Sequence, residues 1–179
     1  MQRSANKLFA KRFVACEQWG PVPKPPGFDS WDAVMGIALE EAQLAWEAGE
    51  VPVGSIVLNK GGEIVGRGQN ACIKNHDVSA HAEIMALRMA GKTLGNYRLN
   101  DCVLVVTLEP CAMCAAAIVM ARLAGVVYGC VDQQAGAVVS RSEYLDVPFC
   151  QGAPVWHLGG IRAFECCYML QQFFAEKRS

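Results

Sequence analysis

Two short stretches of this chain carry side chains that can act together in chemistry: His81–Glu83 (His-Ala-Glu) and Pro110–Cys114 (Pro-Cys-Ala-Met-Cys). They supply one imidazole, two thiols and one carboxylate. An imidazole and two thiolates suit Zn²⁺, and a zinc ion with three protein ligands keeps one coordination position for water. The pattern therefore predicts one zinc ion per chain, held by His81, Cys111 and Cys114.

The carboxylate of Glu83 has a separate predicted role, as a proton carrier that does not bind the metal. A three-ligand zinc lowers the pKa of its water to about 7, so that hydroxide is available for attack at neutral pH. A neighbouring carboxylate can take the proton of that water and deliver it to a leaving amine. Hydrolytic deamination of an amidine-like ring carbon requires these two acts, which makes Glu83 the predicted catalytic residue.

Each stretch also has an ordinary structural interpretation. The two cysteines lie three residues apart on one helical face, which alone is typical of buried structural cysteines. A redox pair is disfavoured because no thioredoxin-like context surrounds them. Alone, His81 favours a capping or core histidine, and Glu83 a capping-box or helix-dipole carboxylate. A closed structural zinc would need Cys102 or Cys130 as fourth ligand and would leave Glu83 without a role, so the joint pattern favours a catalytic site.

The segments before the first stretch predict a helix and a β-hairpin. Helical spacing predicts a helix from Trp31 to about Ala48, capped by Asp29 or Ser30 and stopped by Gly49. Two β-rich segments, residues 51–58 and 63–69, flank a turn signal and predict an antiparallel hairpin. A polar loop is expected at residues 70–79.

The remaining segments predict strands that alternate with helices. In chain order they are a helix at 80–91, a buried central strand at 101–108, a helix at 111–123, a strand at 125–129, an irregular segment at 131–153 with a helical turn around Ser142, an edge strand at 154–157 and a helix at 161–177. This order predicts a three-layer α/β/α domain with a mixed central sheet. Both chemical stretches begin helices, and strand-to-helix turns can bring them together at one edge of the sheet.

Length and composition predict one compact domain, residues 29–179, preceded by a basic, proline-rich extension, residues 1–28. The 179 residues are 53% hydrophobic and 18% charged, which allows a sizeable core. No apolar run is long enough to cross a bilayer, so no membrane partner is expected. Nine cysteines, an odd count without a secretory signal, favour reduced thiols and a cytoplasmic location. The extension is compatible with a transit peptide and with a bacterial extension.

The charge of the chain is unevenly distributed. Residues 1–28 carry five basic side chains and one acidic, whereas residues 29–179 carry eleven basic and sixteen acidic side chains. A nucleic-acid partner usually requires a basic surface, so charge alone gives no support for RNA binding.

Several stretches resemble bacterial tRNA adenosine deaminases, which belong to the cytidine-deaminase-like zinc superfamily. The zinc signature is shared by the whole superfamily. The contexts Ala80–Arg88 (Ala-His-Ala-Glu-Ile-Met-Ala-Leu-Arg) and Val106–Ala115 (Val-Thr-Leu-Glu-Pro-Cys-Ala-Met-Cys-Ala) point more narrowly to the tRNA enzymes. The resemblance extends over residues 31–177 and includes Pro52–Ser55, Asn75–Asp77, Val126–Gly129, Asp132, Gly136-Ala137, Glu165-Cys166 and Phe173-Phe174.

This resemblance implies a homodimeric enzyme that converts the wobble adenosine of a tRNA anticodon to inosine, with the anticodon stem-loop as partner. It implies that His81, Cys111 and Cys114 hold zinc, that hydroxide attacks C6 and that Glu83 carries protons. It also implies substrate-binding roles for four further residues: Asn70 at the target base, Asp132 near the RNA backbone, and Phe173 and Phe174 on the last helix. Lys177 and Arg178, at the end of that helix, would lie near phosphates. Read without the family, Asn70 is a turn residue, Asp132 a loop acid, and the two phenylalanines core residues.

The chain departs from the family pattern at Val138–Ser140, where relatives usually carry Gly-Ser, and at Phe149–Gly152, where many carry Asn-His.

Two other functions are compatible with the zinc signature. A deaminase of a free base or nucleoside, of guanine or cytosine type, would use the same zinc and Glu83 and suits the acidic surface. A non-catalytic, zinc-stabilised binding module would not need Glu83.

Overall fold

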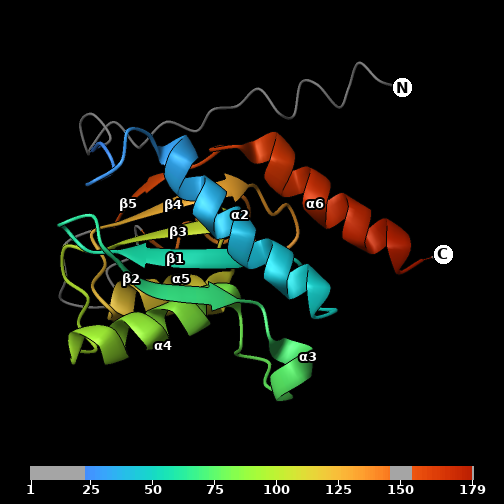
Figure 1. The fold of residues 1–179 in the computed structure, drawn as a ribbon, viewed down its shortest axis with the longest axis horizontal. Helices are drawn as coiled ribbons and strands as arrows, with labels where there is room; N and C mark the ends of the chain where they lie inside the picture. The colour runs from blue at the N-terminus through green and yellow to red at the C-terminus, as the bar shows by residue number, and fades with distance from the viewer. Residues whose placement is uncertain (1–22, 146–154, 179) are drawn as a thin grey trace.

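The computed structural model describes residues 23–145 and 155–178 (Figure 1). Most of the predicted N-terminal extension, and the departure at Phe149–Gly152, lie outside the described residues. The elements in chain order are α2 (Trp31–Glu47), β1 (Gly54–Leu58), β2 (Ile64–Gln69), α3 (Cys72–Asn75), α4 (Ala82–Leu94), β3 (Val103–Leu108), α5 (Ala112–Met120), β4 (Gly125–Cys130), β5 (Trp156–Leu158) and α6 (Ala163–Glu176).

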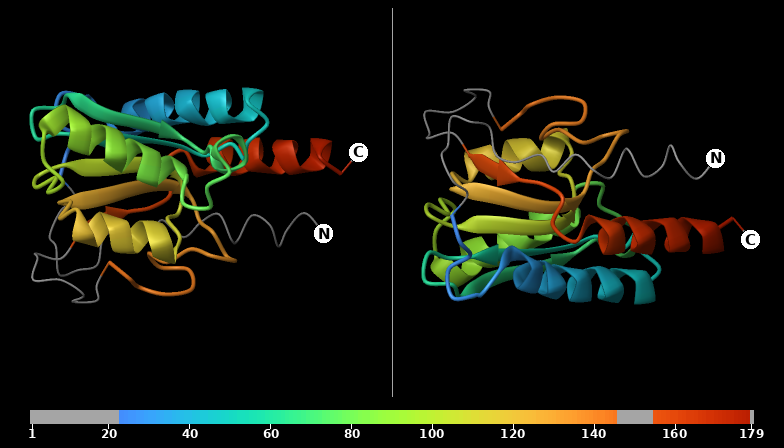
Figure 2. Two further views of the ribbon diagram at one scale, coloured as in Figure 1. Left: turned by 90° about the horizontal axis from the view of Figure 1, so that it is seen from below. Right: turned by 90° about the horizontal axis from the view of Figure 1, so that it is seen from above.

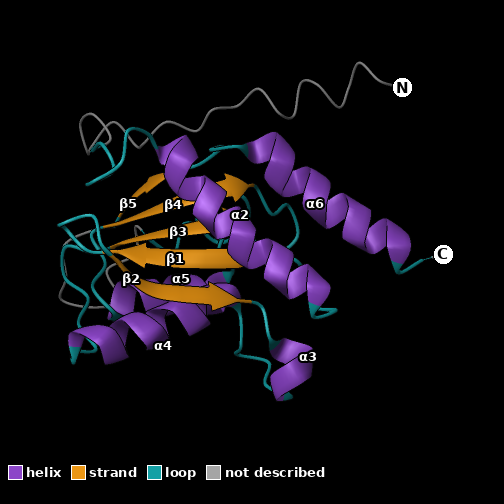
Figure 3. Ribbon diagram, in the orientation of Figure 1, coloured by secondary structure: helices purple, strands orange, loops and turns teal. Residues whose placement is uncertain are grey.

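The sheet has five strands in the order β2-β1-β3-β4-β5 (Figure 3). Strand β1 pairs antiparallel with β2 and with β3, whereas β3, β4 and β5 are mutually parallel neighbours. The predicted hairpin and mixed sheet are therefore confirmed. Because β2, β3 and β4 run in one direction, their carboxyl ends meet at the same edge of the sheet.

Helices cover both faces of the sheet, as Figure 2 shows. One core cluster joins α4 and α5 to residues such as Leu104 and Val106, and the other joins α2 and α6 to Val103 and Val105. Alternating residues of β3 thus enter both cores. This confirms the predicted central strand and the three-layer architecture.

Two glycines of β2 seat α4 directly on the sheet. A Cβ atom at Gly66 would lie 2.3 Å from the carbonyl oxygen of Ala86, and one at Gly68 would lie 2.3 Å from that of Ala82. Both distances are shorter than real Cβ contacts, so only glycine allows this approach. The close packing fixes the start of α4, where His81 lies.

Helix α2 ends as its sequence predicts. Ser30 caps the start by accepting a hydrogen bond from the backbone N–H of Ala33 at 3.3 Å. At the other end, Gly49 has φ +78° and donates to Trp46, while the N–H of Glu50 donates to Ala45. These two bonds form a Schellman motif, which holds Glu50 firmly against the end of the helix.

Several predicted boundaries differ from the structure. The expected loop at 70–79 contains the short helix α3, and α4 continues past Gly91 until Gly95, which has φ +62° and ends it. Strand β1 begins at Gly54 instead of Val51, after Pro52, which has no N–H to donate to a sheet. The described residues around Ser142 form turns without a helix.

The prediction of reduced thiols is wrong for one pair, because Cys130 and Cys167 form a disulfide. The end of β4 and the inner face of α6 bring their Cα atoms to 5.3 Å, within bridging range, across 37 residues of sequence. The other described cysteines are free. In the part of the chain that is described, no helix has the length and apolar character needed to cross a membrane.

Candidate active site

A cavity of about 320 Å³ lies at the edge of the sheet where β2, β3 and β4 end. The start of α4 contributes His81 and Glu83 to its lining, and the turn between β3 and α5 contributes Cys111. Asn70 follows β2 and Asp132 follows β4. Segments far apart in the sequence therefore meet here because three strands end at one edge, which is where open α/β sheets place their sites.

The three predicted metal ligands converge at this edge. The Nδ1 atom of His81 lies 3.6 Å from the Sγ atoms of both Cys111 and Cys114. All three donor atoms lie within 4.8 Å of one another. Tetrahedral zinc with Zn–S of about 2.3 Å and Zn–N of about 2.0 Å separates sulfur from nitrogen by about 3.5 Å, so this donor set fits the ion.

Two of the ordinary interpretations, a capping role for His81 and a closed structural zinc, do not fit the structure. His81 and Cys111 both occupy N-cap positions with extended backbone, yet neither side chain makes a capping hydrogen bond. Cys102 lies at the opposite end of β3, and Cys130 is disulfide-bonded. No fourth ligand from these cysteines closes the site, as a structural zinc would require.

The three donor groups shift one another's pKa values. A hydrogen bond from Cys114, assisted by His81, lowers the pKa of Cys111 to about 4 despite its burial. The pKa of Cys114 is raised because it donates that hydrogen bond and is itself buried. The pKa of His81 is raised by its hydrogen bond with Cys111. A divalent cation replaces the protons at such sites, because thiolate and neutral imidazole are the forms that bind metal.

Glu83 lies in the first turn of α4 and is only 4% exposed. Burial raises the pKa of its carboxyl group. A carboxyl group with a raised pKa can exchange a proton near neutral pH, whereas an ordinary surface glutamate stays ionised. It lies beside the donor triad, in a cavity large enough for a small ring, which is consistent with its predicted role as proton carrier.

Comparisons with known proteins agree with this geometry. The model of the family described as cytidine and deoxycytidylate deaminase zinc-binding region matches residues 29–130. The tRNA-specific adenosine deaminase of Agrobacterium fabrum is 44% identical over 80% of this chain and 93% of its own length. A structure solved in a study of A-to-I editing by tRNA:A34 deaminases has a TM-score of 0.71 and 41% identity, covering 75% of this chain and 96% of that chain.

The chain belongs to the family of the tRNA-specific adenosine deaminases. It is also 47% identical, over 84% of its length, to a tRNA(Ile)-lysidine synthase of Deinococcus radiodurans, but spans only 25% of that longer protein. The predicted fold class and zinc cofactor are confirmed. The assignment of individual residues to metal, proton transfer and substrate remains a prediction that rests on the geometry.

The structure brings Asn70 and Asp132 to the cavity but not Phe173. Asn70 is 9% exposed, and its Nδ2 donates to Glu50 at 3.3 Å. Phe173 is 5% exposed and packs edge-to-face on Trp46, as a core residue does. Its neighbour Phe174 is 43% exposed and lines a separate cavity of about 520 Å³ between α6 and the loop after β4, which Asp132 also lines.

Two buried glutamates at the cavity escaped sequence reasoning. Glu50 and Glu109 are 1% and 2% exposed. The Glu109 carboxylate accepts hydrogen bonds from the loop after β4. The backbone donors are the N–H groups of Asp132, Val138, Val139 and Ser140. The hydroxyl group of Ser140 is a fifth donor. The sequence indicates their burial only through their position, because Glu50 directly precedes one apolar strand segment and Glu109 directly follows another.

Proposed function

We propose that this chain converts the wobble adenosine of a tRNA anticodon to inosine by zinc-dependent hydrolysis, with residues 29–179 as the deaminase domain. The observation that carries the proposal is the buried Glu83 beside three converging metal donors. Family membership and the relatives described above support the choice of substrate. A reaction on tRNA is consistent with a cytoplasmic location.

His81, Cys111 and Cys114 would hold the zinc ion. When bound, zinc lowers the pKa of water to about 7 and so supplies a nucleophile at neutral pH. Glu83 would take a proton from the attacking water and deliver it to the departing amine, and its raised pKa suits both acts. Apolar side chains of the lining, including Val53 and Leu108, restrict the access of bulk water to the base.

A base inside a cavity of about 320 Å³ must leave the anticodon stack to reach Glu83. The residues at the rim then contact the rest of the loop. Asp132 lines both the catalytic cavity and the neighbouring one, and Phe174 offers an exposed ring on which a flanking base can stack. Lys177 and Arg178, at the end of the same helix, supply positive charge for phosphates.

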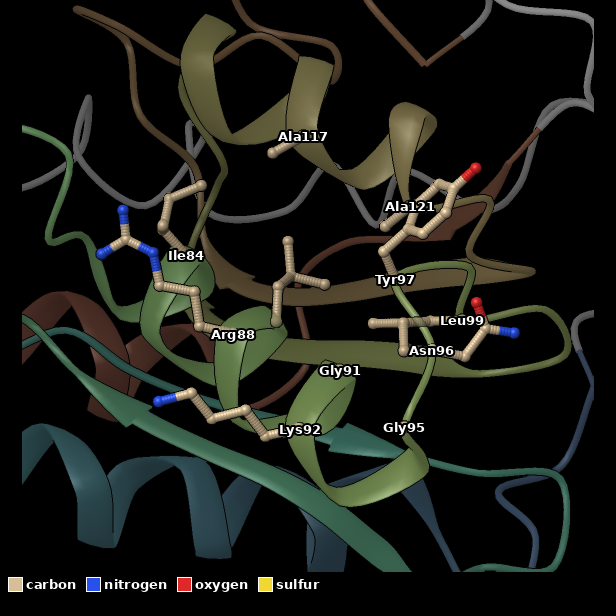
Figure 4. Close-up of a pocket in the computed structure, with 11 residues that line it drawn as sticks. Ile84, Arg88, Gly91, Lys92, Gly95, Asn96, Tyr97, Leu99, Ala117 and Ala121 are labelled. Carbon is tan, nitrogen blue, oxygen red and sulfur yellow. The ribbon is translucent and has the colours of Figure 1, made fainter.

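The surface between α4 and α5 supports the homodimer. A cavity of about 530 Å³ opens there, with Arg88 and Lys92 on one side and Tyr97 on the other, as Figure 4 shows. Tyr97 is 70% exposed, and Met120, at the end of α5, is 65% exposed. Large exposed apolar groups around a cavity are typical of an association surface, and we propose a second copy of the chain as the occupant.

The dimer is tested by Tyr97→Glu, which adds a charge to this surface without touching the metal donors. Light scattering after gel filtration should give a monomeric mass for the variant and a dimeric mass for the wild type. If the Tyr97→Glu variant is still dimeric, the dimer interface lies elsewhere on the protein.

The substrate is tested by product analysis. The purified protein is incubated with an anticodon stem-loop that carries adenosine at the wobble position and, separately, with guanine, cytidine and adenosine. Inosine in the stem-loop, with no ammonia from the small molecules, is the expected result. Ammonia from guanine without inosine in the RNA would replace the proposal by a free-base deaminase.

A further inference from the structure

The buried carboxylate of Glu50 takes no part in the metal site or in proton transfer, yet it lies in the wall of the catalytic cavity. One of its oxygens accepts a hydrogen bond from Asn70 Nδ2 at 3.3 Å. The other accepts from the backbone N–H of Lys74 at 2.7 Å. Both contacts bring together segments that are distant in sequence.

The position of Glu50 is fixed from both sides. The Schellman motif at the end of α2 holds its backbone, since the N–H of Glu50 donates to Ala45 at 2.9 Å. Its bond to Lys74 caps the start of α3, a helix whose N-cap residue makes no side-chain hydrogen bond. The carboxylate is thus a rigid acceptor.

A rigid acceptor decides which way the amide of Asn70 points. An ionised carboxylate only accepts hydrogen bonds, so the amide must turn its NH₂ group toward Glu50 and its carbonyl oxygen away. On the opposite side, the thiol of Cys72 donates to Asn70 Oδ1 at 3.7 Å, which favours the same orientation. Burial and the nearby charge of Glu50 raise the pKa of Cys72, which keeps it a thiol and therefore a donor.

We propose that Glu50 is a positioning residue that fixes the orientation of the Asn70 amide, and thereby sets the donor and acceptor that this wall offers to the base. Two of the four hydrogen-bonding positions of the amide are taken, one N–H by Glu50 and one lone pair by Cys72. One N–H and one lone pair remain for a ligand in the cavity, in a fixed arrangement. This inference rests on the proposed function only in that the ligand is a base to be deaminated.

The substitution Glu50→Gln inverts this arrangement and keeps both contacts of residue 50. The glutamine oxygen can still accept from Lys74, which leaves its NH₂ group facing Asn70. The Asn70 amide must then turn over and present its oxygen to the glutamine. The bonds of residue 50 to Lys74 and Asn70 are kept and the long Cys72 bond is lost, while the donor and acceptor offered to the base exchange places.

A double-mutant cycle tests the inference. We expect Glu50→Gln to lower kcat/KM for the stem-loop by about 10- to 100-fold, with one zinc per chain retained and a thermal midpoint near that of the wild type. Because Glu50 acts through Asn70, the double variant Glu50→Gln, Asn70→Ala should be no slower than Asn70→Ala alone. The matched control is Glu47→Gln, at an exposed residue of α2 that accepts a hydrogen bond from Gln43; this variant should match the wild type.

Additive losses in the double variant would overturn the inference, as would an unchanged kcat/KM in Glu50→Gln. If Glu50→Gln does not fold, the cycle is repeated with Glu50→Ala, and the same two outcomes decide it. Wild-type activity on the stem-loop tests the proposed function separately. The cycle is measured with whichever base the wild-type protein deaminates, so the two claims can fail independently.

Discussion

Three buried glutamates surround the catalytic cavity, and they divide it into two regions with different tasks. Glu83 belongs to the helix-start region, the first turns of α4 and α5, where burial raises the pKa of its carboxyl group. Glu50 and Glu109 belong to the strand-end region, which comprises the end of β3 and the loops that follow α2, β2 and β4, and there they accept hydrogen bonds from backbone N–H groups. The proposed mechanism therefore uses one residue type as a proton carrier in one region and as a fixed acceptor in the other.

The difference lies in what surrounds each carboxyl group. A carboxylate that accepts hydrogen bonds from backbone N–H groups holds those donors in place. A carboxyl group raised in pKa by burial gains and loses its proton more readily near neutral pH. In the proposed mechanism, side chains at helix starts bind the metal and transfer the proton. Buried hydrogen-bond acceptors hold the loops that face the substrate in place.

The largest effect should come from breaking the donor triad in the helix-start region. Cys114→Ala should abolish zinc binding and reduce deamination to background, because two donors no longer hold the ion. Metal analysis and product formation measure both. The matched control is Cys102→Ala, a buried cysteine at the other end of β3, which should retain one zinc per chain. Loss of zinc from the control would instead support a structural zinc site with Cys102 as its fourth ligand.

A smaller effect is expected in the strand-end region from Glu109→Gln. The amide places an N–H group among the backbone donors of residues 132–140, which should lower the free energy of unfolding by about 1–3 kcal/mol. Zinc content should stay at one per chain, and KM for the stem-loop should rise because Asp132 is no longer held. Urea unfolding measures the stability.

The control for this variant is Glu143→Gln, an exposed residue just beyond the same loop, which should change the stability by less than about 0.5 kcal/mol. Equal stability of Glu109→Gln and the wild type would show that the carboxylate does not hold the loop.

The smallest effect concerns Asp77, in the loop that leads to His81. Hydrogen bonds from the hydroxyl and N–H groups of Ser79 lower the pKa of the Asp77 carboxyl group below its ordinary value of 3.8. The stability contributed by ionised Asp77 is therefore present above that value and lost as pH falls through the lowered pKa. Asp77→Asn should lower the thermal midpoint at about pH 7 and leave it nearly unchanged at about pH 2. If the thermal midpoints of variant and wild type differed equally at both pH values, ionised Asp77 would not be the source of this stability.

The helix-start region could be predicted from sequence because its signals are local. His81 and Glu83 are two residues apart, Cys111 and Cys114 three apart, and both pairs begin helices after strands or strand-linked loops. The same local logic predicted the hairpin and the mixed sheet, from turn residues and an apolar central strand. Family resemblance added the substrate, which the acidic body of the chain does not suggest.

The strand-end region could not be predicted, because its partners are distant in sequence. The bond from Asn70 to Glu50 spans 20 residues, and the bond from the Ser140 N–H to Glu109 spans 31. The disulfide of Cys130 and Cys167 spans 37 and contradicted an argument from cysteine count. A buried carboxylate also looks the same in sequence as a solvated one, so only the fold identifies it.

The account depends most on Glu83, and one measurement tests it directly. Glu83→Gln protein, loaded with zinc, is mixed in excess with a wobble-adenosine stem-loop, and inosine is followed in a single turnover. We expect one zinc per chain, binding of the stem-loop as in the wild type, and a rate lower by about 10³- to 10⁴-fold, because the amide cannot carry the proton. Inosine formed at the wild-type rate would contradict the assignment of Glu83 as the proton carrier.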